Sequence, residues 1–469
     1  MSRSIKIIIL AAVTLLLTTI VGTCFAASTT PNVSNDMLNA DYWIARMIGP
    51  DDLIMTQEEI SVFNKDIIHK LPETVYDLTS YPSSLTQEQL TKLVTQRPFP
   101  EEDRFLGEKK VNSTYYQKLK EQMNLAGIKA DNKVNYAFTV KRADLRTFPT
   151  TDVSFSEPGD WEFDMFQETA VRAAEPVLIL HRSSNRQWYF VQVYNYYGWM
   201  SARDLAIADN KITWLEYINA DKSLVVTGNK LRLDFNRYSP ELSELELNMG
   251  TKLPLSAVIP TTVDNQSVAG NYVVRLPVRN RSGGLIIKFA LIPVNSDVSE
   301  GYMPFTRANI IRQAFKLQGE RYGWGGMFSG RDCSALVMDV YKSFGFMLPR
   351  NSGEQEQSAG KTVQFDSLTT ENRYALIDTL LPGAALITPT HEMLYVGQYY
   401  GHYYVIHDVT SLGDANNRNP DGTVGKLVLN QVVVTDLSLP RRNGITLVDS
   451  LRTGKQFENI ARLNNPTQP

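Results

Sequence analysis

The chain has 469 residues, and since domains average roughly 150 residues, this length predicts about three domains. Hydrophobic residues make up 43% and charged residues 21%, with 28 glycines and 22 prolines, which excludes collagen-like, low-complexity and largely disordered chains. The formal net charge of −3 excludes a strong basic field, so we expect no nucleic-acid partner. Two cysteines are too few for a disulfide framework in a chain this long.

The start of the chain has the pattern of an export signal. Two basic residues precede an apolar run over residues 7–21, which is shorter than the ~20 residues of a membrane span and is followed by small residues. We predict a signal peptide over residues 1–26 and a mature protein that is exported, periplasmic or associated with the cell envelope, and not integral to the membrane. A lipid anchor on Cys24 and an uncleaved anchor helix are the alternatives.

The remaining chain divides into four parts by sequence texture. Residues 32–133 are predicted to be helical and irregular, with a helix start at Thr56. Short aromatic and β-branched runs over residues 134–210, and again over 220–300, predict two small β-barrels. Helix and strand patterns alternate over residues 303–465, which form the last predicted part.

Cys333 lies at the predicted start of a helix that follows a glycine-rich loop. The apolar residues of this helix recur at helical spacing and are expected to be buried: Leu336, Val337, Val340, Tyr341 and Phe344. A thiol in the first turn faces free backbone N–H groups and the positive end of the helix dipole, so we expect the thiolate to be favoured. After signal cleavage Cys333 is the only cysteine, either buried and inert or used for chemistry.

Three of the five histidines lie close together in the last part, on two predicted strands joined by a turn. If Gly397 and Gly401 pair across a three-residue turn, His391 and His407 lie directly opposite each other on one sheet face. His402 has the opposite parity, so we expect it to face away as a surface residue.

A cysteine at a helix start and two cross-strand histidines are what nucleophilic acyl transfer needs: a thiolate, a base and acid, and a polar group that orients the base. The same residue types also bind zinc. Three ligands without a carboxylate at metal spacing, beside a glycine-rich loop, make a zinc site the weaker interpretation. We therefore predict neither a metal nor an organic cofactor.

Five motifs follow one another in the last part: Tyr322-Gly-Trp-Gly-Gly326, Asp332-Cys333-Ser334, Leu348-Pro-Arg350-Asn-Ser352, His391-Glu-Met-Leu-Tyr-Val-Gly397 and Ile406-His407. In this order they resemble the NlpC-type family of papain-like cell-wall cysteine peptidases. The aromatic segment 188–201 is similar to the end of a bacterial Src-homology-3-like (SH3-like) domain, and its side chains fit either hairpin packing or a peptide-facing groove.

The resemblance implies a multidomain α+β chain. Its expected parts are a helical N-terminal stabilising segment, two small SH3-like β-barrels and a C-terminal papain-like α+β peptidase domain. Residue by residue, Cys333 matches the family's nucleophile, His391 its general base and acid, and His407 the orienting third residue.

The resemblance also implies a substrate-binding role for three further residues. Tyr322 matches a tyrosine that lines the family's active site. Asp332 and Ser334 match residues that hold the ammonium of an N-terminal L-alanine in related enzymes. For these last two, helix capping is an equally good interpretation, because Asp and Ser are common in a first helical turn.

The expected activity is hydrolysis of the γ-D-glutamyl-diamino-acid bond in peptidoglycan stem peptides or murein fragments, on peptides with a free N-terminal L-Ala. Two alternatives stay open. One is an N-acetylmuramoyl-L-alanine amidase or acyltransferase on the same scaffold, and the other is a non-catalytic protein that binds the cell wall.

Overall fold

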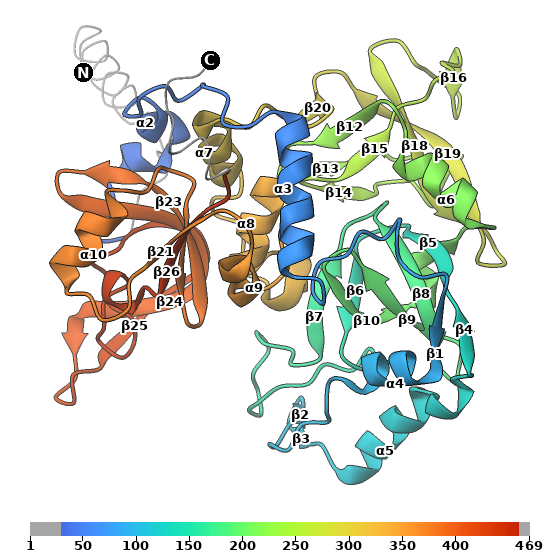
Figure 1. The fold of residues 1–469 in the computed structure, drawn as a ribbon, viewed down its shortest axis with the longest axis horizontal. Helices are drawn as coiled ribbons and strands as arrows, with labels where there is room; N and C mark the ends of the chain where they lie inside the picture. Colours follow the sequence, from blue (N-terminus) through green and yellow to red (C-terminus); the bar gives the residue numbers. More distant parts are fainter. Residues whose placement is uncertain (1–29, 459–469) are drawn as a thin grey trace, which may run out of the picture.

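The computed structural model describes residues 30–458. The predicted signal peptide, Cys24 and the end of the predicted 303–465 part therefore lie outside the described residues. Figure 1 shows the C-terminal part on one side and two β-rich regions on the other, with α3 (Gln57–Lys70) standing between them. Among residues 30–458, no helix is both long and apolar enough to cross a bilayer.

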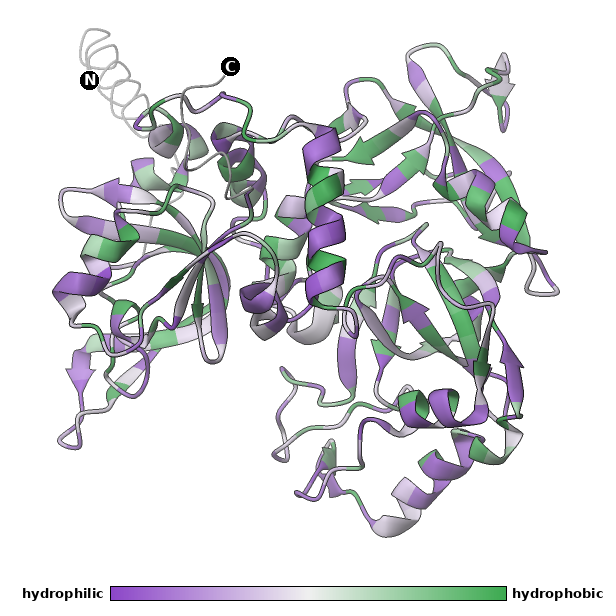
Figure 2. Ribbon diagram, viewed as in Figure 1, coloured by the Kyte–Doolittle hydropathy of each residue, from purple (hydrophilic) through white to green (hydrophobic). Residues whose placement is uncertain are grey.

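The N-terminal part carries the helices η1 (Asn35–Leu38), α2 (Ala40–Ile44), α3, α4 (Gln87–Thr95), α5 (Ser113–Gln122) and η2 (Leu125–Gly127), and the short strands β1 (Ser84–Thr86), β2 (Phe105–Leu106), β3 (Lys109–Lys110) and β4 (Asp131–Lys133). The helix predicted to start at Thr56 is α3, because Thr56 and Glu59 cap its first turn reciprocally. Both hydrophobic and hydrophilic residues lie along α3 (Figure 2), and the apolar ones Ile60, Phe63 and Ile67 are buried.

Side chains of the N-terminal part bond to the C-terminal part. Asn64 on α3 donates to the Gly345 carbonyl at 2.9 Å and accepts from the Met347 backbone N–H at 2.8 Å. The Trp43 ring on α2 lies 5.1 Å from the ring of Tyr404. These contacts agree with a stabilising role for the segment, which stays a prediction.

The first β-rich region forms one sheet of seven strands in the order β11-β5-β8-β9-β10-β6-β7. The strands are β5 (Asn135–Thr139), β6 (Ala143–Arg146), β7 (Gln167–Val171), β8 (Pro176–Arg182), β9 (Trp188–Val193), β10 (Tyr196–Ser201) and β11 (Leu205–Ile207). Trp199 is completely buried, so this aromatic residue of the 188–201 segment belongs to the core. Helix η3 (Ala202–Asp204) connects β10 to β11, and α6 (Lys211–Ile218) follows the last strand of the sheet.

The second β-rich region is all β, but its pairing is more divided than the first. A three-stranded sheet, β15-β12-β20, accompanies the pairs β13-β14, β16-β17 and β18-β19. The strands are β12 (Ser223–Val226), β13 (Lys230–Arg232), β14 (Glu246–Asn248), β15 (Lys252–Pro254), β16 (Thr262–Val263), β17 (Gln266–Ser267), β18 (Asn271–Arg279), β19 (Leu285–Pro293) and β20 (Val298–Glu300). That this region is an SH3-like barrel stays a prediction.

The C-terminal part packs helices against an antiparallel sheet in the order β21-β26-β22-β23-β24-β25. The strands are β21 (Lys361–Gln364), β22 (Ala385–Thr388), β23 (His391–Tyr399), β24 (His402–Arg418), β25 (Val424–Asp436) and β26 (Thr453–Gln456). The helices are α7 (Arg307–Phe315), η4 (Trp324–Ser329), α8 (Cys333–Lys342), α9 (Ser352–Gln357), α10 (Thr370–Ile377) and η5 (Val448–Ser450). Helix α8 packs on β23 and β24, and its five predicted core residues are buried.

Candidate active site

Cys333 is the first residue of α8, as predicted from the sequence. Asp332 caps the helix, and its side chain accepts the Ala335 backbone N–H at 3.0 Å. The Cys333 sulfur accepts a hydrogen bond from the backbone N–H of Glu392, the residue after His391. The start of the helix therefore places the thiol against the start of β23.

The expectation that the helix start favours the thiolate is wrong for this site. Burial, followed by the charges of Asp332 and Glu392, raises the pKa of Cys333 to about 12. Burial and the charge of Arg441 lower the pKa of His391 to about 4. Loss of water disfavours both the thiolate and the imidazolium, so at neutral pH the site holds a neutral thiol and a neutral imidazole.

His391 and His407 lie on the same face of the β23–β24 hairpin, but they are not directly opposite as predicted. The strands turn at Tyr400 and Gly401, and Tyr399 pairs with His402. Val396 is then bulged, since Gly397 pairs with Tyr404 while Tyr395 pairs with Val405. The bulge moves the register by one residue, which returns the two histidines to one face as diagonal neighbours.

The two imidazoles are hydrogen-bonded to each other. His391 Nε2 lies 2.6 Å from His407 Nδ1, and His407 Nε2 lies 2.9 Å from the Thr435 hydroxyl oxygen. When His391 Nε2 and His407 Nε2 carry the protons, each donates along this chain and His391 Nδ1 is left to accept a proton. His402 is exposed, as predicted, and its Nδ1 lies 2.7 Å from Asp436.

Asp332 and Ser334 are held by Arg350. The Arg350 guanidinium donates to both Asp332 carboxylate oxygens, at 2.6 and 3.1 Å, and to the Ser334 hydroxyl at 3.0 Å. Burial opposes ionisation of Asp332, but the charge and hydrogen bonds of Arg350 outweigh it and lower the pKa of this carboxyl. The capping role of Asp332 is therefore observed, and its substrate role stays a prediction.

The glycine-rich loop is the surface on which the first β-rich region docks. Gly325 and Gly326 have φ of 55° and 88°, and a Cβ on Gly326 would lie 2.6 Å from that of Ala170 on β7. Arg142 donates to the Gly326 carbonyl at 2.7 Å, and Gln167 donates to the Gly325 carbonyl at 3.0 Å. The two glycines let β7 approach the loop that precedes Cys333.

A cavity of about 500 Å³ opens at this junction. Its lining includes Cys333, His391, Tyr322, Asp332 and Ser334 from the sequence prediction. The buried His407 reaches the cavity only through His391. Burial raises the pKa of Tyr322, which keeps its hydroxyl protonated. Of the predicted site residues, five are thus brought together at the surface of one cavity.

Sequence reasoning missed several residues at this site, of which five are polar or charged groups that the proposed chemistry or the cavity charge depends on. Glu168 and Tyr196 from the first β-rich region and Arg441 and Arg442 from the loop after β25 line the cavity, and Thr435 holds His407. The aromatic richness of residues 188–201 was the only signal for one of them, Tyr196. Among residues 30–458 no three His, Cys, Asp or Glu side chains gather as a metal-ligand set.

Two buried carboxyl groups lie beneath the site without hydrogen bonds. Within residues 30–458, neither oxygen of Glu392 nor of Asp408 has a hydrogen-bond partner. Burial, followed by the charges of Asp332 and Glu356, raises the pKa of Glu392 well above its ordinary value. Burial, followed by the charges of Glu320 and Asp332, raises that of Asp408 to about 9. Asp408 is therefore protonated at neutral pH, and burial favours the protonated form of Glu392 in the same way.

Comparison with known proteins supports the assignment of the C-terminal part and of the first β-rich region. Residues 319–425 match the model of the NlpC/P60 family, and residues 154–201 match that of an SH3 domain of the SH3b1 type. The chain is 29% identical over 130 residues to the Gamma-D-glutamyl-L-lysine dipeptidyl-peptidase of Bacillus subtilis (strain 168), with 27% of this chain and 36% of the relative covered. The chain therefore spans about a third of the length of this relative.

A solved structure from Photobacterium damselae shares the fold. An NlpC/P60 endopeptidase from Photobacterium damselae subsp. piscicida matches 89% of this chain and 97% of its own, with a TM-score of 0.69 and 18% sequence identity. An NlpC/P60 family protein from Bacillus cereus ATCC 10987 covers 69% of this chain and 100% of its own, with a TM-score of 0.47 and 20% identity. The chain therefore carries a domain of the NlpC/P60 family, a cysteine peptidase family, together with an SH3 domain.

Proposed function

We propose that the protein is an exported cysteine endopeptidase that hydrolyses the γ-D-glutamyl-diamino-acid bond of peptidoglycan stem peptides. The observation that carries this proposal is the shared cavity of Cys333 and His391, with His391 oriented by a hydrogen bond to His407. The Bacillus subtilis relative is named for a γ-D-glutamyl bond, which supports the choice of bond.

The neutral resting site sets the first step of the reaction. The Cys333 thiol transfers its proton to Nδ1 of His391 as the sulfur attacks the γ-carbonyl carbon of D-glutamate. His407 accepts the Nε2 proton of the resulting imidazolium in a hydrogen bond, which stabilises the charge and fixes the ring. Backbone N–H groups at the start of α8 are placed to stabilise the oxyanion.

The same imidazolium then completes the cycle. His391 returns its proton to the amine of the diamino acid, the C–N bond breaks, and the glutamyl group remains as a thioester on Cys333. Water then loses a proton to His391 and attacks the thioester carbon. The carboxylic acid leaves, and the sulfur recovers its proton from His391.

The charges around the cavity match such a peptide. Arg441 and Arg442 line one part of it and suit the free carboxylate of a γ-linked D-glutamate. Glu168 and Asp332 line it as well and suit the ammonium of an N-terminal L-alanine. The SH3 domain thus supplies one wall of the cavity, through β7 and Tyr196.

Mass spectrometry of products tests the proposal. The wild type is expected to split L-Ala-γ-D-Glu-diamino-acid peptides at the γ bond, and Cys333→Ala to bind them without cleavage. Acetylating the N-terminal alanine is expected to raise KM, because the ammonium is lost. Release of intact stem peptides from muramoyl peptides would instead identify an amidase, and equal turnover by Cys333→Ala would overturn the proposal.

A further inference from the structure

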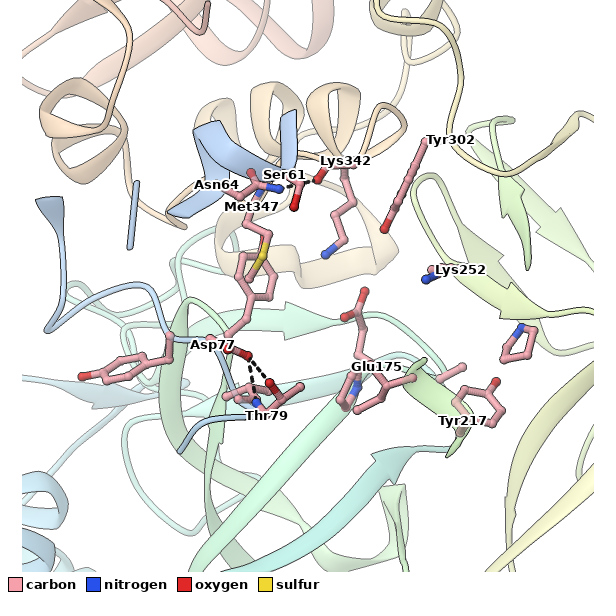
Figure 3. A pocket seen from close by; sticks show the side chains of 18 of the residues that line it. Ser61, Asn64, Asp77, Thr79, Glu175, Tyr217, Lys252, Tyr302, Lys342 and Met347 are labelled. Carbon is pink, nitrogen blue, oxygen red and sulfur yellow. Dashed lines mark hydrogen bonds between the residues drawn. The ribbon is translucent and has the colours of Figure 1, made fainter. Parts of the chain in front are cut away.

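A second cavity, of about 390 Å³, lies at the junction of the N-terminal part, both β-rich regions and helix α8. Its volume falls within the range of small-molecule sites, about 300–1,000 Å³. Figure 3 shows Lys342, Lys252, Tyr302 and Glu175 around it, with the ammonium groups of both lysines directed inward. Lys342 is the last residue of α8, about 14 Å along the helix axis from Cys333 at 1.5 Å per residue.

Neither lysine is ion-paired to an acidic residue in the described chain, although the charge of Glu175 partly opposes the effect of burial on the pKa of Lys342. Within the described chain neither ammonium group has a hydrogen bond or ion pair, and each is instead placed near an aromatic ring. Lys342 lies 4.3 Å from the centroid of Tyr194, and Lys252 lies 5.9 Å from that of Tyr302. Burial lowers the pKa of both lysines, so an anion in the cavity would stabilise their charged forms.

The acidic residues that line the cavity have partners elsewhere. Glu175 pairs with Arg172 at 3.5 Å, and Asp77 accepts the backbone N–H and the hydroxyl of Thr79 at 2.9 and 2.7 Å. Neither forms an ion pair with Lys252 or Lys342 in the part of the chain described. The cavity therefore offers two cationic groups to a ligand.

Packing against the backbone of a neighbouring turn fixes the position of the Lys342 side chain. Gly250, in the turn after β14, has φ of 81°, and a Cβ there would lie 2.6 Å from Cγ of Lys342. The backbone of the second β-rich region thus fixes the stem of this lysine and directs its ammonium group into the cavity. The remaining wall is largely apolar, with Phe138 and Trp214 fully buried behind it.

We propose that this junction cavity is a second ligand site for a small organic anion with an apolar body, whose acidic group binds the ammonium groups of Lys252 and Lys342. The apolar body packs against the aromatic wall beside Trp214 and Tyr217. The Tyr217 hydroxyl is already bonded to the Arg275 carbonyl at 2.8 Å, so its ring rather than its hydroxyl meets the ligand. The site is separate from the Cys333 cavity and shares none of its lining residues.

Two fluorescent probes of similar shape test the charge requirement in the full chain. The anionic probe is 8-anilinonaphthalene-1-sulfonate, and the neutral one is N-phenyl-1-naphthylamine, which lacks the sulfonate. We expect one anionic probe to bind per chain, and Lys342→Met and Lys252→Met each to weaken its binding about tenfold, since each variant removes one charged contact to the sulfonate. Binding of the neutral probe is expected to change less than about twofold.

Two further variants control for folding and for binding elsewhere. The exposed Lys118→Met is expected to leave both titrations unchanged, and Ser61→Trp, on the exposed side of α3 at the cavity edge, to weaken both probes. Peptide hydrolysis by every variant reports that the fold is intact. Absence of saturable binding, or lysine variants that bind the anionic probe as the wild type does, would overturn the proposal.

Discussion

The polar side chains on the two faces of the β23–β24 hairpin differ in their hydrogen bonding. On one face, His391 and His407 form a chain of hydrogen bonds that continues to Thr435. On the other, Glu392 and Asp408 follow them directly in sequence, yet within residues 30–458 their carboxyl oxygens have no hydrogen-bond partners. The first face fixes the orientation of groups that must exchange protons, whereas burial favours the protonated form of the carboxyl groups on the second.

A single bulged residue determines which side chains share each face. With the two-residue turn alone, His391 and His407 would lie on opposite faces, because side chains alternate along a strand. The bulge at Val396 restores their alignment and places Glu392 and Asp408 together on the reverse face. Catalytic geometry here depends on register as much as on residue identity.

The largest expected effect comes from removing the base on the first face. We expect His391→Ala to lower kcat/KM on γ-D-glutamyl peptides by about 10³–10⁴-fold, because general acid and base assistance are both lost. His402→Ala, on the same hairpin but exposed, is the matched control and should stay within about twofold of the wild type in the same kinetic assay. Equal losses in both variants would contradict the assignment of roles.

Removing the bulge should exchange the two faces. Deletion of Val396 would direct residue 391 to the reverse face, so we expect a loss of activity as large as that of His391→Ala. Val396→Ala keeps the bulge and should retain most of the activity. Circular dichroism of the deletion variant checks that the sheet still forms, and a folded, active deletion variant would contradict the role given to the register.

His407 orients His391 and does not contact the substrate, so its loss should be smaller. We expect His407→Ala to lower kcat about 10–100-fold with little change in KM. His407→Asn should recover part of the loss, because the amide oxygen can accept the His391 Nε2 proton. Steady-state kinetics distinguish this from a structural role, in which Asn and Ala would lose activity equally.

The pH profile tests whether the resting pair is neutral. Since the base works only when unprotonated and the pKa of His391 is about 4, kcat/KM should fall only as pH drops through about 4. Arg441→Ala removes a positive charge that lowers this pKa, so the acid limb should move upward, whereas the exposed neighbour Arg442→Ala should leave it in place.

Alkylation by iodoacetamide measures the protonation of the Cys333 thiol without a substrate. Because the pKa of Cys333 is about 12, alkylation should be slow at pH 7 and rise about tenfold per pH unit to at least pH 9. A rate that is already constant below pH 7 would indicate a thiolate, and with it the ion pair that the helix dipole alone would favour.

Sequence alone predicted those parts of the molecule that depend on local pattern. The α8 start at Cys333, its buried stripe and the helix start at Thr56 follow from residue spacing and capping chemistry. The shared face of His391 and His407 was also predicted, but from a three-residue turn, whereas the structure has a two-residue turn and a bulge. Side chains alternate regularly within the strand on either side of a bulge, so the sequence pattern does not reveal where the bulge lies.

The sequence alone could not predict the features of the site that depend on long-range packing. Thr435 lies 28 residues beyond His407, and Glu168 reaches the cavity from the SH3 domain. The thiol pKa was also mispredicted, because burial, the largest cause of its rise, comes from tertiary contacts that no single helix specifies. The helix dipole is a local property and could be predicted, whereas desolvation could not.

The smallest expected effect concerns the reverse face. Asp408 has a pKa of about 9 in the folded chain and about 3.9 when unfolded, so its stabilising contribution is complete below about pH 4 and is lost as pH rises toward 9. Asp408→Asn cannot ionise, so it should melt a few degrees above the wild type at pH 8 and lose that advantage at pH 4. Thermal unfolding at both pH values measures this difference.

Glu392→Gln should behave in the same direction, since burial also raises the pKa of Glu392. Peptide hydrolysis near pH 6.5 should change less than about twofold in Asp408→Asn, because a protonated carboxyl and an amide are both neutral. Glu216→Gln, on the exposed side of α6, is the control and should show no pH-dependent gain in stability of this kind. Both carboxyl variants could instead lose stability relative to the wild type as pH rises. Glu392 and Asp408 would then have to be ionised in the folded chain, and the two faces would differ only in hydrogen-bond partners and not in protonation.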